Sequence, residues 1–573
     1  MADNYDDYSR EQLLRLIRER DRAPRLGLVW ERDEIDHDLS VNNDFVALDW
    51  DEKLSCGDGP QQNLIIEGDN FDALRTLRMT HAGRVKGIYI DPPYNTGNRD
   101  FIYNDRFIDK DDNYRHTKWL EFMFRRLELA KELLAEDGVI FVSIDDNEVF
   151  HLGLLMEQVF GEKNCLAKLI WQTDGNFDNQ ARFKVCHEYV LVYAVAESQV
   201  GAPPTIDPNA EETGKLFRDV IRNTIVKNGP KNPVSEIHLP AGFPADFESG
   251  TIPARIDKWP HFLSDAVIED GKLSTAVIVK SGWANKHLCE RFIATGFAPV
   301  WDTKNQLTTF KLTSTGAIEN VKVRSENQSH VISVIKNVGS VQSSGADLLA
   351  QGIDFTYPKP VGLIKYLISM IEDKNALVLD FFAGSGTTGQ AVLELNAEDG
   401  GNRNFILVSN TEATPDLPTK NICRDVCAKR VSQAVTGYQR KKGGTVAALG
   451  GSFAYLRCRR VPAANVFRSI QHTQIWTALQ LIHEVPLTLY KAASSLQIAQ
   501  GKRGLFIYVP KISETVLDLL KTAISSAPEA VIYSWQPALL AQRLYDPRIS
   551  FEPIPAFLVN RFGARSTAKG GRS

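Results

Sequence analysis

An aspartate, two prolines and a tyrosine, Asp91-Pro92-Pro93-Tyr94, directly follow an apolar run that ends at Ile90. Proline lacks a backbone N–H and has a fixed φ, so this tetrapeptide is a rigid turn with many hydrogen-bond acceptors. The Asp91 carboxylate and the two proline carbonyls suit an exocyclic amine, which offers two N–H donors. The Tyr94 ring offers a flat face on which an aromatic heterocycle can stack. The alternative is a rigid turn without chemistry, because Asp-Pro-Pro also occurs in ordinary loops.

A second candidate is the glycine-rich turn at residues 384–386, which follows an apolar strand that contains Asp380. Glycine lets the backbone approach a ligand closely where a strand turns into a helix. The Asp380 carboxylate is placed to meet a ligand ammonium group. No lysine follows at the position that a Walker loop requires. A tight structural turn is the alternative for this motif.

Alternating strands and helices must position both turns. This rhythm predicts βαβ units and a largely parallel sheet, in which ligands bind at the carboxyl ends of the strands. Between residues 200 and 345 the rhythm disappears. The expected strands are 63–68, 85–90, 138–144, 376–382, 404–409, 504–509 and 530–533, with a hairpin of 167–171 and 188–195; the expected helices are 9–21, 116–135, 361–371 and 387–397, and an acidic loop-rich stretch runs from the first helix to about residue 62.

Composition and charge limit the class of protein. The chain has 573 residues, 43% of them hydrophobic and 24% charged, which is typical of a globular protein with three or four folding units. No apolar run is long enough for a membrane helix, and the acidic start does not resemble a signal peptide. Seven irregularly spaced cysteines indicate reduced thiols, so we expect a cytoplasmic protein. Residues 1–60 carry a net charge of -8 and residues 421–460 a net charge of +8, which makes the latter a candidate for contact with a polyanion.

The two turns together resemble those of the S-adenosylmethionine-dependent amino methyltransferases that act on DNA. The Asp-Pro-Pro-Tyr motif precedes the Phe382-x-Gly-x-Gly motif, which is the permuted β-class order typical of adenine-N6 enzymes. The longer string of residues 91–97, Asp-Pro-Pro-Tyr-Asn-Thr-Gly, is most similar to the modification (Mod) subunits of type III restriction–modification systems. Further similar segments are 63–77, 119–120, 138–146, 187–193 and 355–360.

The resemblance implies a permuted Rossmann-like class I methyltransferase fold, which is α/β with a mostly parallel seven-stranded sheet and flanking helices. An inserted target-recognition domain and a small C-terminal α/β module complete it. Trp259, Trp283 and Trp301 are expected in the core of the insertion, and the alternative is that they act as wedges in DNA. The expected boundaries are 1–62 for an N-terminal extension, 63–199 for the catalytic half, 200–345 for target recognition, 346–465 for the cofactor-binding half, and 466–573 for the C-terminal module, with a role in dimerisation or partner docking.

The resemblance also assigns site residues. Asp91, Pro92, Pro93 and Tyr94 are the expected catalytic residues, and no metal ligand is expected. Relatives often carry an acid that binds the cofactor ribose where this chain has Asn410, so Asn410 or Glu412 must serve. The expected S-adenosylmethionine-binding residues are Asp69, Asn70, Lys359, Asp380, Phe382, Ala383, Gly384, Ser385, Gly386, Thr387, Thr388 and Asn410.

The implied activity is methylation of the N6 amine of a flipped-out adenine in double-stranded DNA, within a restriction–modification or related phage-defence system. The alternatives are a recognition subunit with weak or partner-dependent methylation, and an N4-cytosine methyltransferase. The expected partners are double-stranded DNA, a second copy of the chain in a homodimer, and a separate restriction, helicase or other defence subunit, without membrane contact. The candidate DNA-binding residues are Lys215, Arg218, Arg222, Arg430, Arg440, Lys441 and Lys442.

Overall fold

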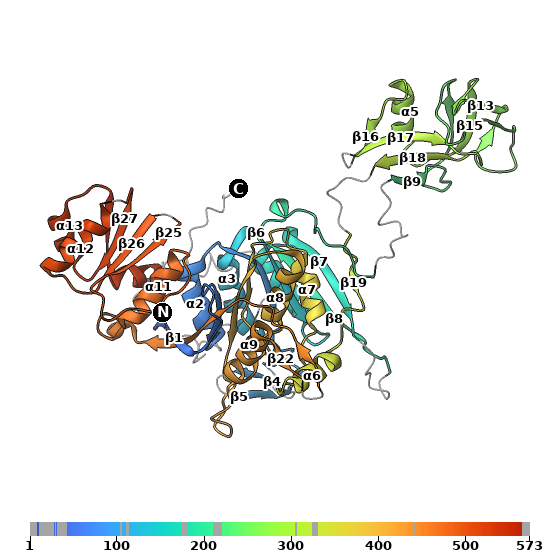
Figure 1. Cartoon of the computed structure of the whole chain (residues 1–573). Coiled ribbons are helices and arrows are strands. Elements are labelled where there is room, and N and C mark those ends of the chain that lie inside the picture. Colours follow the sequence, from blue (N-terminus) through green and yellow to red (C-terminus); the bar gives the residue numbers. More distant parts are fainter. Residues whose placement is uncertain are drawn as a thin grey trace. The chain divides into compact units, whose positions relative to one another are not determined.

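The chain divides into two compact units, one formed by residues 1–208 with 331–573 and the other by residues 209–330 (Figure 1). The expected helix at 9–21 lies outside the described residues except for its first two positions. The computed structural model describes residues 9–10, 28, 30, 43–103, 106–109, 114–173, 182–209, 220–303, 306–323, 330–440, 443–502, 504–525 and 527–563.

A ten-stranded sheet forms the centre of the larger unit, in the order β1-β24-β2-β21-β20-β3-β6-β8-β7-β19. The expected seven-stranded, mostly parallel sheet is its middle, from β2 to β7, while β1, β24 and β19 extend the two edges. The strands are β1 (Phe45–Cys56), β2 (Asn63–Glu67), β3 (Val85–Ile90), β6 (Leu134–Ile144), β7 (Cys165–Gln172), β8 (His187–Ala194), β19 (Val334–Ile335), β20 (Leu377–Asp380), β21 (Asn404–Ser409) and β24 (Phe453–Val461).

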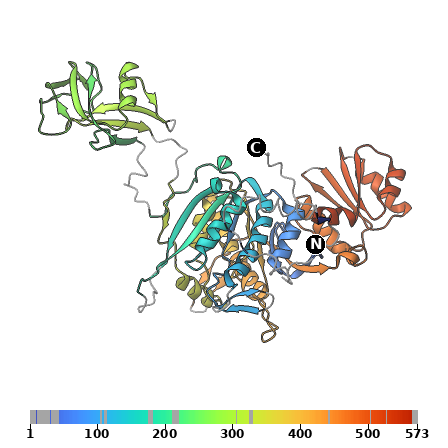
Figure 2. The same cartoon turned by 180° about the vertical axis from the view of Figure 1, so that it is seen from behind.

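Helices cover both faces of this sheet (Figures 1 and 2). Along β3, Ile88 and Ile90 pack into a core with α2 (Asn70–His81), α3 (Arg115–Leu133) and α4 (Val149–Phe160), whereas Tyr89 packs into a core with α7 (Val361–Ser369), α8 (Thr387–Asp399) and α9 (Lys429–Thr436). Burial on both faces explains why the strands read as continuous apolar runs. The remaining elements are β4 (Asn98–Tyr103), β5 (Arg106–Asp109), η2 (Glu162–Asn164), η3 (Glu197–Gln199), α6 (Val341–Ala350), η5 (Cys423–Ala428), β22 (Tyr438–Gln439), β23 (Thr445–Val446), η6 (Ala463–Asn465) and α10 (Val466–Ser469).

The edge pair β1–β24 corrects the sequence analysis. Residues 45–56 were expected in a loop, but they form a strand that pairs antiparallel with β24. Arg457 of β24 lies 2.8 Å from Asp51 and 3.4 Å from Glu67, and Arg460 lies 2.5 Å from Asp72. Arg457 and Arg460, two of the nine basic residues of segment 421–460, are therefore paired with acids of the fold.

The C-terminal module packs against β1 and α2 of the same unit. Its sheet has the order β25-β26-β27-β28, and the last three strands are parallel. The Arg78 side chain donates to the Phe562 carbonyl at 2.7 Å, and Arg561 donates to the Met79 carbonyl at 2.6 Å. The module contains α11 (His472–Ile482), β25 (Gln497–Gly501), β26 (Gly504–Val509), α12 (Glu514–Ile524), β27 (Ala530–Ser534), α13 (Pro537–Leu544), β28 (Ile549–Pro553) and α14 (Ala556–Gly563).

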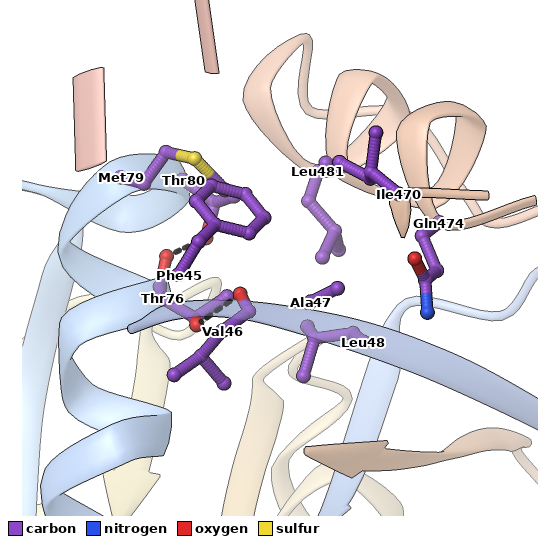
Figure 3. Close-up of a pocket in the computed structure, with 11 residues that line it drawn as sticks. Phe45, Val46, Ala47, Leu48, Thr76, Met79, Thr80, Ile470, Gln474 and Leu481 are labelled. Atoms are coloured by element: carbon purple, nitrogen blue, oxygen red, sulfur yellow. Dashed lines mark hydrogen bonds between the residues drawn. The ribbon is translucent and has the colours of Figure 1, made fainter. Parts of the chain in front are cut away.

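Figure 3 shows the seam between this module and the main sheet. Phe45 and Met79 on one side face Ile470 and Leu481 on the other, and the Thr76 hydroxyl donates to the Val46 carbonyl at 2.9 Å. The space left between them is about 10 Å³, room for no more than one water molecule. The seam is thus a packed core and not a ligand site. None of the helices in the described parts of the chain is long and apolar enough to cross a membrane.

The smaller unit is built from short antiparallel strands around its own apolar core. Its sheets have the orders β10-β15-β12, β11-β13-β14 and β16-β17-β18-β9. Trp283 is buried as expected, but Trp259 and Trp301 are 41% and 54% exposed, so their expected place in the core is wrong. The elements are β9 (Val220–Thr224), β10 (Val234–Leu239), β11 (Gly250–Ile252), β12 (His261–Phe262), β13 (Ala266–Glu269), β14 (Lys272–Leu273), β15 (Val277–Gly282), α5 (Lys286–Ala294), β16 (Val300–Trp301), β17 (Leu307–Leu312) and β18 (Ile318–Val323).

Candidate active site

The two turns identified from the sequence lie over one cavity. Strands β3 and β20 are parallel neighbours, so the turns that follow them meet at the same edge of the sheet. The cavity has a volume of about 650 Å³. Tyr94 and Gly386 are next to residues of the lining without being part of it. The predicted residues that line the cavity are Asp69, Asn70, Asp91, Pro92, Pro93, Lys359, Asp380, Phe382, Ala383, Gly384, Ser385, Thr387, Thr388 and Asn410.

The glycine-rich turn closes on the carboxylate of its own Asp380. Asp380 accepts hydrogen bonds from the Phe382 backbone N–H at 3.0 Å and from the Thr388 hydroxyl at 2.5 Å. Gly386 has a φ of 76°, and a Cβ atom there would lie 3.0 Å from the Cys427 carbonyl oxygen. Burial raises the pKa of Asp380 to about 7. The carboxylate therefore shapes the turn and lacks a countercharge of its own, which suits a positively charged ligand group.

Arg430 supports the same turn from behind. Its guanidinium donates to the Ser385 hydroxyl at 3.0 Å, the Thr387 hydroxyl at 2.6 Å and the Gln390 side-chain carbonyl at 2.8 Å. The residue is 3% exposed, and burial lowers its pKa to about 10. The expected contact of Arg430 with DNA is wrong, because its side chain faces the interior.

A third part of the lining lies at the start of α2. Asp69 caps this helix by accepting from the Phe71 backbone N–H at 2.9 Å. Arg126 donates to Asn70 at 2.5 Å and to Asp69 at 3.3 Å. Sequence reasoning missed Arg126, because nothing distinguishes it from the other charged residues of α3 until the fold brings it to the cavity.

The Asp-Pro-Pro-Tyr turn offers fewer free acceptors than expected. The Trp119 indole donates to the Pro93 carbonyl at 2.7 Å, so this carbonyl does not serve a substrate. By contrast, Asp91 Oδ1 is buried and faces Lys359 Nζ at 3.3 Å in an ion pair, but no described residue makes a hydrogen bond of good geometry to it. A buried carboxylate oxygen that still has room for a hydrogen bond marks a place where a ligand donor belongs. Asp91 with the Pro92 carbonyl thus forms the candidate receptor for an amine.

Two residues distant in sequence hold Tyr94 and face Asp91. The Tyr94 hydroxyl donates to Glu188 at 2.8 Å, and Lys359 Nζ lies 2.7 Å from both the Tyr94 hydroxyl and Glu188. Lys359 Nζ is also 3.3 Å from Asp91 Oδ1. Sequence reasoning placed Lys359 among the cofactor residues and missed Glu188, although Glu188 lies in the 187–193 segment that resembles the family.

This group combines one basic side chain, Lys359, with two acidic ones, Asp91 and Glu188. Burial raises the pKa of Asp91; Lys359 opposes this change and Glu188 adds to it. Burial alone would lower the pKa of Lys359, but its two carboxylate neighbours raise it. Lys359 is therefore positively charged between two acids.

A second cluster, His116, Glu148 and His151, has residue types that could hold a metal ion. Arg115 lies 3.2 Å from His116 Nε2, and since an arginine only donates, Nδ1 of His116 carries the proton and donates to Glu148 at 2.6 Å. The Asn95 amide donates to the same Glu148 oxygen at 2.5 Å. These hydrogen bonds explain the cluster as a support for the residue after Tyr94.

Few of the candidate DNA-binding residues can be judged. Arg222 of β9 is half-exposed and lies 3.5 Å from Asp246, and Arg440 is exposed. Lys215, Arg218, Lys441 and Lys442 lie outside the described residues.

A parallel sheet with a glycine-rich turn and an amine-accepting turn over one cavity defines a methyltransferase of the Rossmann-like class. Residues 85–413 match the family model of N6/N4 methyltransferases, described as DNA methylase, and the chain belongs to this family.

The curated relatives include Mod subunits of type III restriction–modification enzymes. The EcoPI subunit of Escherichia phage P1 is 35% identical over 391 residues, which cover 61% of this chain and 58% of the relative. The StyLTI subunit of Salmonella typhimurium is 32% identical over 61% of this chain and 53% of the relative. The EcoP15I subunit of Escherichia coli is 32% identical over 62% of this chain and 59% of the relative. The chain thus spans a little more than half the length of these relatives.

Proposed function

We propose that this chain transfers a methyl group from S-adenosylmethionine to the N6 amine of an adenine in double-stranded DNA, as the modification subunit of a type III-like system. One observation carries the proposal: Asp91, whose buried Oδ1 is ion-paired with Lys359 but can still accept a hydrogen bond, lies on the same cavity as the glycine-rich turn. The family match and the Mod relatives support it.

The cavity residues fit S-adenosylmethionine. A volume of about 650 Å³ is within the usual range for small-molecule sites. Asp380 and the turn that follows it suit the amino-acid end, Asn410 and Glu412 suit the ribose, and Asp69 suits the adenine, all of them residues of the lining. The bound cofactor supplies an electrophilic methyl group on a sulfonium.

The residues of the chain then orient the acceptor. Hydrogen bonds from the amine to Asp91 and to the Pro92 carbonyl would localise the nitrogen lone pair and direct it at the methyl group. Such positioning and preorganised charge supply most of the acceleration in transfers of this kind. After attack, the amine proton passes to Asp91 or to water.

An adenine inside a duplex must first leave the stack, which costs a few kcal/mol. Stacking on Tyr94 would return about 1–3 kcal/mol of this cost. The ring is fixed for that purpose through its hydroxyl contacts with Glu188 and Lys359.

DNA recognition by the smaller unit, a homodimer, and docking of a separate restriction or helicase subunit are further parts of the proposal. The folded core of residues 209–330 supports the first part, because that unit has an architecture of its own. The names of the relatives support the last part. A cytoplasmic location stays a prediction.

The test is methyl transfer from labelled S-adenosylmethionine to mixed genomic and plasmid DNA, followed by mass spectrometry of the nucleosides. N6-methyladenine is the expected product, and sequencing would give the site. N4-methylcytosine would correct the acceptor. Cofactor binding by calorimetry without any methylated product would instead favour a recognition subunit.

A further inference from the structure

Lys359 connects the two turns of the active site. Its carbonyl accepts from the Thr387 hydroxyl of the cofactor turn at 3.3 Å, while its ammonium group reaches Asp91 and Tyr94 on the other side. The residue is only 8% exposed. A buried lysine normally loses its charge unless acids surround it, so its surroundings decide what it does.

Glu188 of β8 is the second acid beside this lysine. Its Oε2 atom receives both the Tyr94 hydroxyl at 2.8 Å and Lys359 Nζ at 2.7 Å. Lys359 Nζ also lies 4.8 Å from the centre of the Tyr94 ring, within the range of a cation–π contact. The hydroxyl end of the ring is consequently held by Glu188 of β8 and by Lys359, which precedes α7.

We propose that Lys359 and Glu188 are positioning residues for the methyl transfer: Lys359 keeps Asp91 ionised, and the pair fixes the Tyr94 ring for stacking. The inference rests on the proposed function, since it names what prepares Asp91 and Tyr94 for that reaction. Neither residue needs to contact the methyl group.

The charges around Asp91 predict that removing Lys359 and removing the charge of Glu188 shift the pKa of Asp91 in opposite directions. Lys359 favours the carboxylate, whereas Glu188 and, more weakly, Asp380 are like charges, and Tyr94 and Tyr89 are neutral neighbours. Removing the lysine should therefore make Asp91 harder to ionise, and removing the charge of Glu188 should make it easier. Damage to folding would not produce opposite shifts.

The experiment is the single-turnover rate of DNA methylation as a function of pH. On the acid side of the pH profile, the rate falls as Asp91 becomes protonated; we call this part of the profile the acid limb. For K359M we expect the acid limb to move up by about 1–3 pH units, and for E188Q we expect it to move down by about one unit. K359R retains the charge and should restore the wild-type limb even if its rate is lower. Shifts in the same direction, or no shift, would overturn the proposal; if K359M does not fold, E188Q decides by the same criterion.

A matched control lies two turns further along the chain. Lys365 of α7 is also a lysine between two acids, Glu394 at 3.2 Å and Glu398, but it lies away from the cavity. K365M and E394Q should leave the acid limb in place. If they shift it as far as K359M and E188Q do, the effect is a general one of charge and the proposal fails.

A second readout needs no methylation. Infrared difference spectra of the cofactor-free protein at neutral pH should show the carbonyl stretch of a protonated carboxyl in K359M, and this band should vanish in the double variant K359M/D91N. If the wild type methylates no DNA but the band behaves in this way, the proposed function fails and the role of Lys359 stands. A different outcome would refute only the role of Lys359 and leave the proposed function standing. In that case the wild type methylates DNA, but K359M shows neither the carboxyl band nor a shift of the acid limb.

Discussion

The two turns of the active site follow neighbouring strands, yet different kinds of contact hold them. The turn after β20 closes on its own Asp380 carboxylate, and Asn70, Val408, Lys359 and Arg430 add bonds to its backbone and hydroxyls. The turn after β3 depends on Trp119 of α3, Glu188 of β8 and Lys359 before α7. In the first turn the carboxylate is used to shape the turn, whereas in the second the carboxylate of Asp91 stays open to a ligand and side chains from distant segments fix the residues beside it.

The largest effect should come from Asp91, the acceptor in the turn that the distant side chains hold in place. Asp91→Ala removes the amine acceptor, and we expect the rate of methyl transfer to fall by about 10³-fold. DNA binding, measured by fluorescence anisotropy, should persist. Unchanged turnover would contradict the comparison of the two turns, because the distant contacts to the turn after β3 would then have no part in methyl transfer.

The next effect concerns the Tyr94 ring. Tyr94→Ala should weaken the extruded state of the base by about 1–3 kcal/mol, seen as lower fluorescence of 2-aminopurine at the target position. Tyr94→Phe keeps the ring but removes the hydroxyl that contacts Glu188 and Lys359, so an intermediate signal is expected. Equal signals for all three proteins would contradict a stacking role.

Arg430 tests the turn after β20. Arg430→Met leaves the hydroxyls of Ser385 and Thr387 without their charged donor, at a cost of about 1.5–3 kcal/mol per bond before relaxation. We expect cofactor affinity to fall about tenfold in calorimetry, since the turn can still close with its own bonds. Arg424→Met is the control, because Arg424 pairs with Asp425 on the surface. A loss as large as that of Asp91→Ala would mean that this turn also depends on distant support.

The last effect concerns stability and not activity: it is the pH dependence that Asp380 gives to folding. Its pKa rises from 3.8 in the unfolded chain to about 7 in the fold, so the unfolded state ionises first. Stability attributable to this group therefore falls as pH rises from about 4 to 7 and is fully lost above that range. Asp380→Asn should stabilise the cofactor-free protein more at pH 8 than at pH 5, by about 1–3 kcal/mol in chemical unfolding. The same difference at both pH values would contradict the buried, uncompensated carboxylate.

The same contrast explains what could be predicted from the sequence. The strands before both turns and the residues of the turns are local patterns, and the structure places them at one cavity. Arg126 and Glu188 were missed because they enter the site only through tertiary packing. Arg430 was misplaced because the charge of a residue does not reveal whether it faces water. Strand β1 was missed because its partner lies about 400 residues away.

The order of strands in the main sheet also determines when each strand can pair with its neighbours during translation. β2 lies between β21 and β24, and about 390 residues separate β2 from β24. At about 5–20 residues per second, a ribosome needs about 20–80 s to supply that partner after β2 has emerged. Until β21 is made, about 340 residues after β2, the apolar strand β2 lacks both neighbours, while residues 209–330 can already fold around their own core. The nascent chain is therefore most exposed to aggregation and proteolysis before the last strand of the sheet is made.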